Sequence, residues 1–545
     1  MTVETGAEAI ARVLRLQGID AVFALCGDHI NQLFMAMDRA GIHIIDVRHE
    51  AAGVQMADGY ARATGRPAVF VATGGPGHAN ALTGLQVAMS AATPVVLISG
   101  QTPVAQWETG GQQILRQGDM ARPVAKWAVD AVAPVDLGNL IARALAVAAA
   151  PRPGPVSLSI APPLLDAPHA GPVAQPQLKV QTPHTVAVSG LEDAALALCS
   201  AERPVVVAGS GAMDAPDASA AALLALNAPV FTIDQARGLL PDDEGPCLGY
   251  ADPLFNPAFR RIVEADVLCL AGAAADFHLC FARPHLLAAD TTLIQISDSP
   301  HHLGMNRVPD HLFHGPVGPM LSALVTLTET LTVPSWLGTL RQMRRSALTG
   351  LWETPSGEGD AIHPMDLMRA LLPHQTAKTA ICVDVGDFIH WPRCALPARV
   401  RRGFHDGVLS GNLGSGIPLG LGVQQASPGR PVWVFCGDGG FRFHMSELET
   451  AVAHHLPVKV IVGNDSAWGV EQRLQTNAYG RDVGCLLPPL RLDDLARSFG
   501  AGGFRADTRD DLEVVLPAFL AHDGPAVLDV TIPQLCGRPF ADFKR

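Results

Sequence analysis

Short apolar runs alternate along the chain with glycine turns and longer mixed stretches. Examples are 68–72, 94–98, 204–208 and 458–462, in which almost every residue is apolar. Runs of this length are typical of strands that are buried on both faces. Because helical stretches follow them, the pattern predicts an α/β fold with doubly wound parallel sheets.

The alternation is interrupted at two places. Residues from about 164 to 186 are rich in proline and irregular, which predicts a linker, and a second break lies around 351–359. Cutting there predicts three α/β domains of similar size, at 1–165, 187–340 and 360–545. The first and third domains share the same strand–glycine–helix order.

Composition narrows the class of protein. Of the 545 residues, 48% are hydrophobic and 17% are charged, which excludes a disordered chain. The net charge of −13 argues against binding to nucleic acid or to an anionic membrane. No signal peptide and no long apolar run is visible, and the ten cysteines form no Cys-x-x-Cys pair. We expect a cytoplasmic protein with reduced thiols.

Candidate chemistry lies in the last third of the chain. The apolar run 432–436 is followed by Gly437-Asp438-Gly439-Gly440, and the run 458–462 by Gly463-Asn464-Asp465. Parallel strands bind ligands at their carboxyl ends, where glycines let backbone N–H groups approach a diphosphate. Asp438 and an oxygen ligand 27 residues later are suited to hold Mg²⁺ against it.

The alternative is that both segments are ordinary turns, which is the usual meaning of a single Gly-Asp-Gly. Two acidic turns that close strands separated by one helix would face the same crevice. We therefore favour the binding site.

This arrangement resembles the thiamine-diphosphate (ThDP) motif of the decarboxylase/acetolactate-synthase superfamily, over essentially the whole chain. The resemblance implies a pyrimidine-binding domain, a middle domain and a diphosphate-binding domain. It places the Mg²⁺ ligands at Asp438, Asp465 and the backbone carbonyl of Ala467. Asp465 stands where the family usually has asparagine, and Asn464 is the alternative ligand.

The segment 409–418 resembles the loop beneath the cofactor, where an apolar side chain wedges between its two rings. That residue is Leu413, unless it is simply a core leucine, and the Gly411 carbonyl would accept from the 4′-amino group. The turn 385–388 resembles a second diphosphate contact. The implied cofactor-binding residues of this region are Gly386, Asp387, Phe388, Gly411, Leu413, Gly437, Asp438, Gly439, Gly440, Asp465, Ala467, Trp468 and Gly469.

The first third resembles the other half of such a site. The segment 44–53 matches a strand-to-helix turn whose glutamate, here Glu50, contacts the pyrimidine N1′ and promotes deprotonation at C2. The alternative is a carboxylate that only stabilises a helix start. The loop 73–77 resembles one beside the pyrimidine. In this family the halves belong to different subunits, which implies at least a homodimer, and we expect a homotetramer.

Within the superfamily, 26–30 and 48–50 most closely resemble benzaldehyde lyase and cyclohexanedione hydrolase. There a histidine, here His29, faces C2 and shuttles the substrate hydroxyl proton, although it would also suit a helix start. Gln112 or Gln113 would be the active-site glutamine. Aromatic residues that line the benzaldehyde lyase pocket are replaced by Pro162 and Ile389.

The favoured function is a ThDP- and Mg²⁺-dependent carbon–carbon lyase or carboligase acting on 2-hydroxy ketones or aldehydes. The alternatives are an acetolactate-synthase-like enzyme for 2-oxo acids, or a 2-hydroxyacyl-CoA lyase. A dehydrogenase with a nucleotide in the middle domain would leave Glu50, Asp438 and Leu413 unexplained. Relatives use the middle domain for FAD, for ADP or for no ligand, and Gly209-Ser210-Gly211 does not decide between these.

Overall fold

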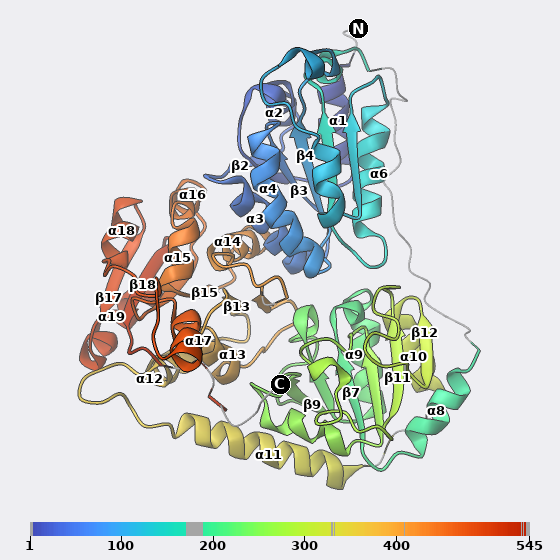
Figure 1. Cartoon of the computed structure of the whole chain (residues 1–545), viewed down its shortest axis with the longest axis vertical. Helices are drawn as coiled ribbons and strands as arrows, with labels where there is room; N and C mark the ends of the chain where they lie inside the picture. The colour runs from blue at the N-terminus through green and yellow to red at the C-terminus, as the bar shows by residue number, and fades with distance from the viewer. Residues whose placement is uncertain are drawn as a thin grey trace.

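The chain folds into three six-stranded parallel sheets covered by helices (Figure 1). The computed structural model describes residues 4–169, 189–328, 331, 333–407, 409–535, 537 and 539–540. Each sheet lies within one of the three predicted ranges, and the predicted α/β fold is confirmed. Most of the predicted linker lies outside the described residues.

The first sheet has the order β2-β1-β3-β4-β6-β5. Its strands are β1 (Ala21–Ala24), β2 (His43–Asp46), β3 (Ala68–Ala72), β4 (Val95–Gly100), β5 (Trp127–Ala131) and β6 (Val156–Ile160). Its helices are α1 (Gly6–Leu16), α2 (Asn31–Arg39), α3 (Glu50–Thr64), α4 (Pro76–Ser90), α5 (Gln117–Ala121), α6 (Leu137–Ala149) and α7 (Pro162–Asp166).

The third sheet repeats this connectivity, with the order β14-β13-β15-β16-β18-β17. Its strands are β13 (Ala380–Val383), β14 (Phe404–Asp406), β15 (Val432–Gly437), β16 (Lys459–Asn464), β17 (Gly502–Ala506) and β18 (Ala526–Thr531). Its helices are α12 (Pro364–Leu371), α13 (His390–Ala395), α14 (Gly416–Ala426), α15 (Asp438–His444), α16 (Glu447–Ala453), α17 (Gly469–Tyr479), α18 (Leu492–Ser498) and α19 (Arg509–Ala521). By position, α3 and α14 are equivalent.

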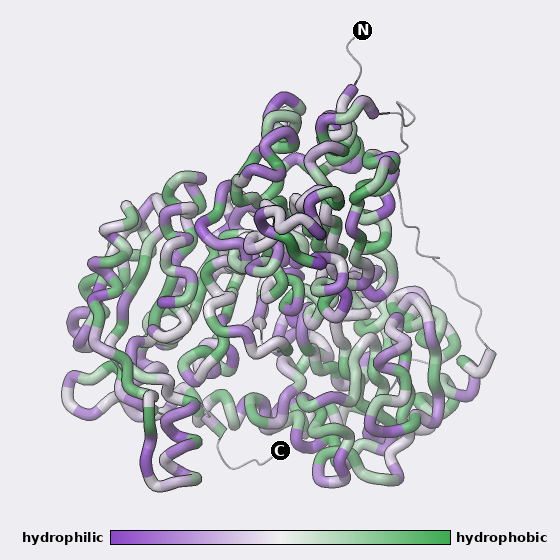
Figure 2. Tube along the Cα trace, turned by 45° about the horizontal axis from the view of Figure 1, so that its top comes forward, coloured by the Kyte–Doolittle hydropathy of each residue, from purple (hydrophilic) through white to green (hydrophobic). Residues whose placement is uncertain are grey.

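The middle sheet differs, with the order β12-β11-β10-β7-β8-β9. Its strands are β7 (Pro204–Ala208), β8 (Val230–Thr232), β9 (Cys247–Tyr250), β10 (Val267–Ala271), β11 (Thr292–Ser297) and β12 (His311–His314). Its helices are α8 (Leu191–Cys199), α9 (Pro216–Leu226), α10 (Val317–Leu327) and α11 (Pro334–Trp352), so the boundary drawn at 340 falls inside α11. Every residue of the central strands β3, β4, β7, β10 and β16 is buried. Hydrophobic segments run through all three domains (Figure 2).

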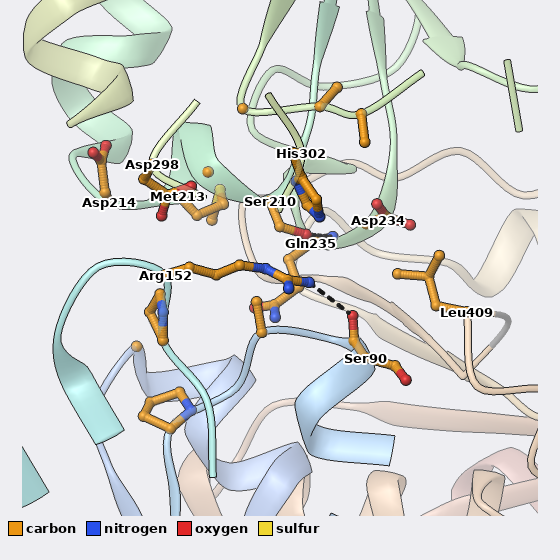
Figure 3. Close-up of a pocket in the computed structure, with 18 of the residues that line it drawn as sticks. Ser90, Arg152, Ser210, Met213, Asp214, Asp234, Gln235, Asp298, His302 and Leu409 are labelled. Atoms are coloured by element: carbon orange, nitrogen blue, oxygen red, sulfur yellow. Dashed lines mark hydrogen bonds between the residues drawn. The ribbon is translucent and has the colours of Figure 1, made fainter. Parts of the chain in front are cut away.

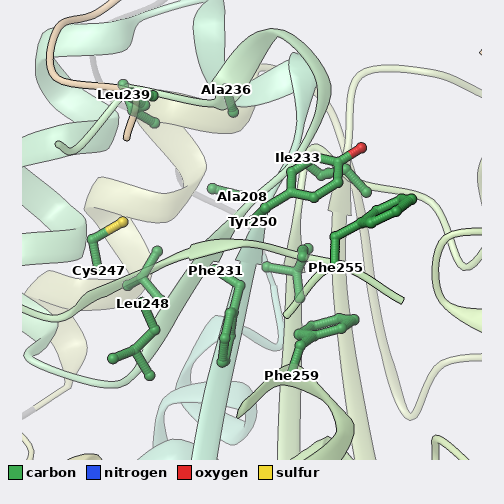
Figure 4. Close-up of a cluster of buried hydrophobic side chains, with 14 of the residues drawn as sticks. Ala208, Phe231, Ile233, Ala236, Leu239, Cys247, Leu248, Tyr250, Phe255 and Phe259 are labelled. Atoms are coloured by element: carbon green, nitrogen blue, oxygen red, sulfur yellow. The ribbon is translucent and has the colours of Figure 1, made fainter. Parts of the chain in front are cut away.

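Aromatic side chains fill the middle domain on one side of its sheet (Figure 4). Phe231 and Phe259 pack edge to face with ring centroids 4.9 Å apart, and Tyr250 and Phe255 lie beside them. The same hydrophobic cluster continues into the third domain, where it includes Trp391, Phe435 and Ile532. The middle domain is therefore packed against the third domain through a shared apolar core.

The first and third domains meet where α3 crosses α14, at a contact between two backbones. A Cβ added to Gly422 would lie 1.9 Å from the Met56 carbonyl oxygen, and one added to Gly59 would lie 2.2 Å from that of Leu419. Only glycine permits so close an approach. The apolar residues around this crossing form one cluster that spans both domains.

We expect the substitution Gly422→Ala to destabilise the protein by about 1–3 kcal/mol, because the new methyl group would overpack the crossing. Gly350→Ala is the matched control, since Gly350 lies in α11 with nothing within 4 Å of an added Cβ. It should stabilise the chain by about 0.5–1 kcal/mol. Thermal unfolding followed by circular dichroism measures both; equal effects would show that the crossing tolerates a side chain.

Candidate functional site

A cavity of about 1050 Å³, counted with its open mouth, lies at the carboxyl ends of β13, β15 and β16. All thirteen cofactor-binding residues that the sequence predicts in the third domain line it. Six further residues line it as well: Val385, Ile389, His390, Gly463, Val470 and Glu471. Among the described residues, the whole lining belongs to the third domain.

Glycines keep the cavity open. A Cβ added to Gly386, Gly411 or Gly437 would meet nothing within 4 Å, so a ligand can reach the backbone at these positions. By contrast, Gly439 is covered by the Trp468 ring. The Asp387 side chain is held by Arg473, which reaches it from α17.

Asp438 and Asp465 follow the paired strands β15 and β16 and share this cavity. Burial raises the pKa of Asp438, and burial together with the neighbouring Asp438 charge raises that of Asp465. Oδ2 of Asp438 accepts from Arg442 at 3.1 Å, but Oδ1 is buried without a hydrogen-bond partner in the described part of the chain. A bound cation would offset the repulsion between the two carboxylates and would coordinate the unpaired oxygen.

Asn464, the alternative ligand, faces away from the cavity. Its Nδ2 donates to Asp529 at 2.9 Å, and its Oδ1 accepts from the Ser466 N–H at 3.3 Å. It is not among the lining residues. The structure therefore favours Asp465 over Asn464 as the ligand on β16.

In the first domain, Glu50 is the first residue of α3, after His49, whose Nδ1 accepts from the Ala51 N–H. Its side chain is 8% exposed, and Oε2 accepts from Asn80 Nδ2 at 3.0 Å. Gly77 lies against the other carboxylate oxygen. Asn80, on α4, could not be found from the sequence because no motif marks it.

His29 lies in the short 3₁₀ helix 28–30, between Gly74 and Gly100. Burial lowers its pKa, and Thr73 Oγ1 lies 3.4 Å from its Nδ1. Gln113, which has a positive φ of 61°, packs against Gly75 of the same loop, whereas Gln112 is exposed. Thus His29 and Gln113 both lie against the loop 73–77, and Glu50 reaches the same loop at Gly77.

The two halves of the predicted site do not share a cavity within one chain. No described residue of the first domain lines the third-domain cavity, and Glu50 has its own neighbours in the first domain. The third-domain cavity therefore lacks the carboxylate that the sequence analysis assigned to it.

A second cavity, of about 1000 Å³, lies between the first and middle domains, and Arg402 and Leu409 of the third domain also line it (Figure 3). It opens at the carboxyl ends of β7 and β10, where the strand order of the middle sheet reverses. Sheets with this order bind dinucleotides at that point. Arg152 reaches into it from the first domain and donates to the Ser90 carbonyl at 3.4 Å, while Asp298 faces it from the middle domain.

Three family descriptions match successive parts of the chain. Residues 4–120 match the N-terminal TPP binding domain of thiamine pyrophosphate enzymes, 191–324 the central domain and 384–530 the C-terminal TPP binding domain. The chain belongs to the thiamine pyrophosphate enzyme family. Thiamine pyrophosphate is ThDP, so the predictions of superfamily, cofactor and carbon–carbon bond chemistry are confirmed.

Similar proteins with curated names fall into three groups. An acetolactate synthase large subunit of Parasynechococcus marenigrum is 30% identical over 97% of this chain and 87% of its own. A 2-hydroxyacyl-CoA lyase 2 of Homo sapiens is 28% identical over 94% of this chain and 87% of its own length. A probable 2-ketoarginine decarboxylase of Pseudomonas aeruginosa is 30% identical over 96% and 94%. The resemblance to benzaldehyde lyase stays a prediction.

The family cofactor suits the third-domain cavity of this ThDP enzyme. The open glycine backbones at 386, 411 and 437 leave room for a diphosphate, and the unpaired oxygen of Asp438 is placed for a divalent cation. No group of three or more His, Cys, Asp or Glu side chains suited to a metal occurs among the described residues, so further ligands would come from backbone and cofactor oxygens.

No helix in the described part of the chain has the length and apolar character to cross a membrane.

Glu447, which the sequence analysis missed, joins the third domain to the turn before Glu50. Its buried carboxylate on α16 accepts the N–H groups of Arg48 and His49 at 3.0 Å each and the Thr450 hydroxyl at 2.8 Å. Burial raises its pKa to about 7. This contact fixes the start of α3 from across the domain boundary.

The raised pKa predicts a pH dependence of stability. As the pH rises, Glu447 ionises in the unfolded chain before it ionises in the folded chain. Its contribution to the free energy of unfolding is therefore full below about pH 4.5 and is lost as the pH rises to about 7. The stability advantage of the wild type over Glu447→Gln should therefore shrink between about pH 5 and pH 8, by up to about 3 kcal/mol.

Melting temperatures of both proteins across that range measure the difference. Glu449→Gln is the control, because the Glu449 side chain is 56% exposed. A gap between wild type and Glu447→Gln that stays constant with pH would show that the carboxylate is ionised throughout.

Proposed function

We propose that this chain is a Mg²⁺- and ThDP-dependent lyase or carboligase that breaks or forms the bond between a carbonyl carbon and a hydroxyl-bearing carbon. The observation that carries the proposal is His29. Because burial lowers its pKa, the imidazole is neutral near pH 7 and able to take a hydroxyl proton. It lies against the loop 73–77, which Gln113 and Glu50 also contact.

In this proposal, Asp438, Asp465 and the Ala467 carbonyl hold Mg²⁺, and the backbone at 437–440 and the turn 385–388 hold the diphosphate. Leu413 and the Gly411 carbonyl orient the two rings. When bound, ThDP supplies a nucleophilic carbon for attack on the substrate carbonyl. The protein's own tasks are to hold a proton at N1′ with Glu50 and to move the hydroxyl proton with His29.

We infer that a second copy of the chain supplies Glu50 and His29 to each third-domain cavity. The support is that the cavity is lined by the third domain alone among the described residues, while the first-domain groups lie elsewhere. A two-fold dimer would complete two sites at once. A tetramer remains the expected assembly.

A second candidate is an enzyme for 2-oxo acids or 2-hydroxyacyl-CoA esters. Relatives named acetolactate synthase, 2-ketoarginine decarboxylase and 2-hydroxyacyl-CoA lyase favour it. Cleaving a 2-hydroxyacyl ester breaks the same kind of bond as cleaving a 2-hydroxy ketone and also needs a base for the hydroxyl proton. A 2-oxo acid, in contrast, loses carbon dioxide and brings no such proton.

For the cavity of the middle domain, we infer an adenine nucleotide, the part that FAD and ADP share. Its position at the reversal of strand order, with the Arg152 cation for phosphate and the Asp298 carboxylate for ribose hydroxyls, supports this. Titration with each nucleotide, followed by calorimetry and by flavin absorbance, distinguishes FAD, ADP and an empty cavity.

The reaction is tested by incubating the protein with ThDP, Mg²⁺ and one member of each substrate class: an acyloin, a 2-oxo acid and a 2-hydroxyacyl-CoA. Release of an aldehyde from the acyloin supports the favoured function. Turnover of the 2-oxo acid alone, with release of carbon dioxide, would replace it by the second candidate.

His29→Ala should slow cleavage of a 2-hydroxy carbonyl substrate by roughly 10²–10⁴-fold, because it removes the base for the hydroxyl proton. ThDP affinity should change little, since His29 is expected to face the substrate rather than the diphosphate. Turnover number, cofactor affinity and melting temperature are measured together. A variant that is less stable but turns over at the wild-type rate would make His29 a structural residue.

Mixing two inactive variants tests the shared site. Glu50→Ala removes the first-domain carboxylate and Asp438→Ala a metal ligand, so each alone should be inactive. If the halves come from different subunits, random reassociation should restore about a quarter of the sites, since half the dimers are mixed and each has one intact site. Mixtures that stay inactive after proven subunit exchange would place both halves in one chain.

A further inference from the structure

Asp384 is a buried carboxylate just beneath the third-domain cavity. It follows β13, is 1% exposed and does not line the cavity itself. Its Oδ1 accepts the Val385 N–H at 2.8 Å and the Gly414 N–H at 3.0 Å, and its Oδ2 lies 3.1 Å from the same Gly414 nitrogen. The backbone N–H groups of Ser415 and Gly416 also favour its charged form.

Three cavity-lining segments meet at this side chain. Val385 begins the turn 385–388, and Gly414 closes the loop that carries Gly411 and Leu413. Gly440 of α15 is the third, because a Cβ there would lie 2.7 Å from Oδ2. These segments come from three separate stretches of the chain, and Asp384 is their common contact.

No basic side chain forms an ion pair with Asp384 within the described ranges of the chain. Backbone N–H groups, including those at the start of α14, stabilise the charge instead, as the positive end of a helix dipole does. Burial nevertheless raises the pKa of Asp384 to about 7. A carboxylate kept at this cost points to a need for two acceptor oxygens at one place.

Gly414 is held from both sides. Its N–H donates to Asp384, and its carbonyl oxygen lies 2.8 Å from Nδ1 of His444. Its φ of +83° and the Phe443 side chain against its Cα exclude a side chain there. With Gly414 fixed, the positions of Gly411 and Leu413, immediately before it, are fixed relative to the turn 385–388.

We propose that Asp384 is a positioning residue for the cofactor: it sets the loop that carries Gly411 and Leu413 against the diphosphate turn. The inference rests on the proposed binding of ThDP in this cavity. Asparagine would keep one acceptor oxygen but would turn an amide donor toward the Gly414 N–H, which lies 3.1 Å from Oδ2.

The test compares Asp384→Asn with the wild type and with Asp366→Asn. Asp366 is a matched control, since its buried carboxylate also accepts backbone N–H groups at the start of a helix, α12, but its partners lie outside the segments that line the cavity. Each protein is saturated with ThDP and Mg²⁺. The readouts are hydrogen–deuterium exchange at C2 of bound ThDP, near-ultraviolet circular dichroism of the bound cofactor, and melting temperature.

We expect Asp384→Asn to slow C2 exchange by about 10- to 100-fold and to change the cofactor dichroism, as for a misplaced buried hydrogen-bonding group. Asp366→Asn should lower the melting temperature with C2 exchange unchanged within about twofold. Wild-type exchange in a folded Asp384→Asn, even with a lower melting temperature, overturns the inference alone. A wild-type chain that binds no ThDP overturns the proposed function and this inference together.

A measurement on the wild type tests the inference even if Asp384→Asn does not fold. Amide hydrogen exchange of the peptide 409–418 reports whether Asp384 holds the Gly414 N–H. Protection of this amide in the protein without ThDP supports the inference. Exchange at the rate of an open loop until ThDP is added overturns it, because the cofactor would then order the loop.

Discussion

The contact of α3 with α14 is the constraint on which the arrangement of the site depends. Gly59 and Gly422 allow the two helix backbones to touch, and an apolar cluster then continues from the first domain into the third. This closeness brings Glu447 within hydrogen-bonding distance of the turn before Glu50. Larger side chains at the crossing would push the two helices apart and leave the buried Glu447 carboxylate without its backbone N–H donors.

Buried carboxylates divide into two kinds around the cavity. Asp384 and Glu447 are surrounded by backbone N–H groups, which satisfy them and tie distant segments together. Asp438 instead keeps an unpaired oxygen, and it lies beside a second carboxylate. The first kind has its partners within the protein, whereas the second has an oxygen that is suited to a cation. The hydrogen-bond partners, more than the pKa values, distinguish the structural from the binding carboxylates.

The repeated strand order explains why the site has two halves. In both the first and the third sheet the second strand leads into the equivalent helices α3 and α14. Glu50 begins one of them, and the loop with Leu413 precedes the other. The two domains therefore present different chemistry from the same place in the fold. The middle sheet has another order and places its cavity at its own strand ends, away from the ThDP cavity.

Local features of the sequence determined the parallel sheets and the residues that line the third-domain cavity. Apolar strands and glycine turns act over short stretches, so Asp438 and Asp465 could be found from their spacing after two strands, and Leu413 from the resemblance to the family's loop. Asp384, Glu447 and Asn80 could not, because their partners are backbone N–H groups or side chains far away in the sequence or outside any motif. Only the structure shows which of Asn464 and Asp465 faces the cavity, because Asn464 is held by Asp529, a residue distant in the sequence, while Asp465 lines the cavity.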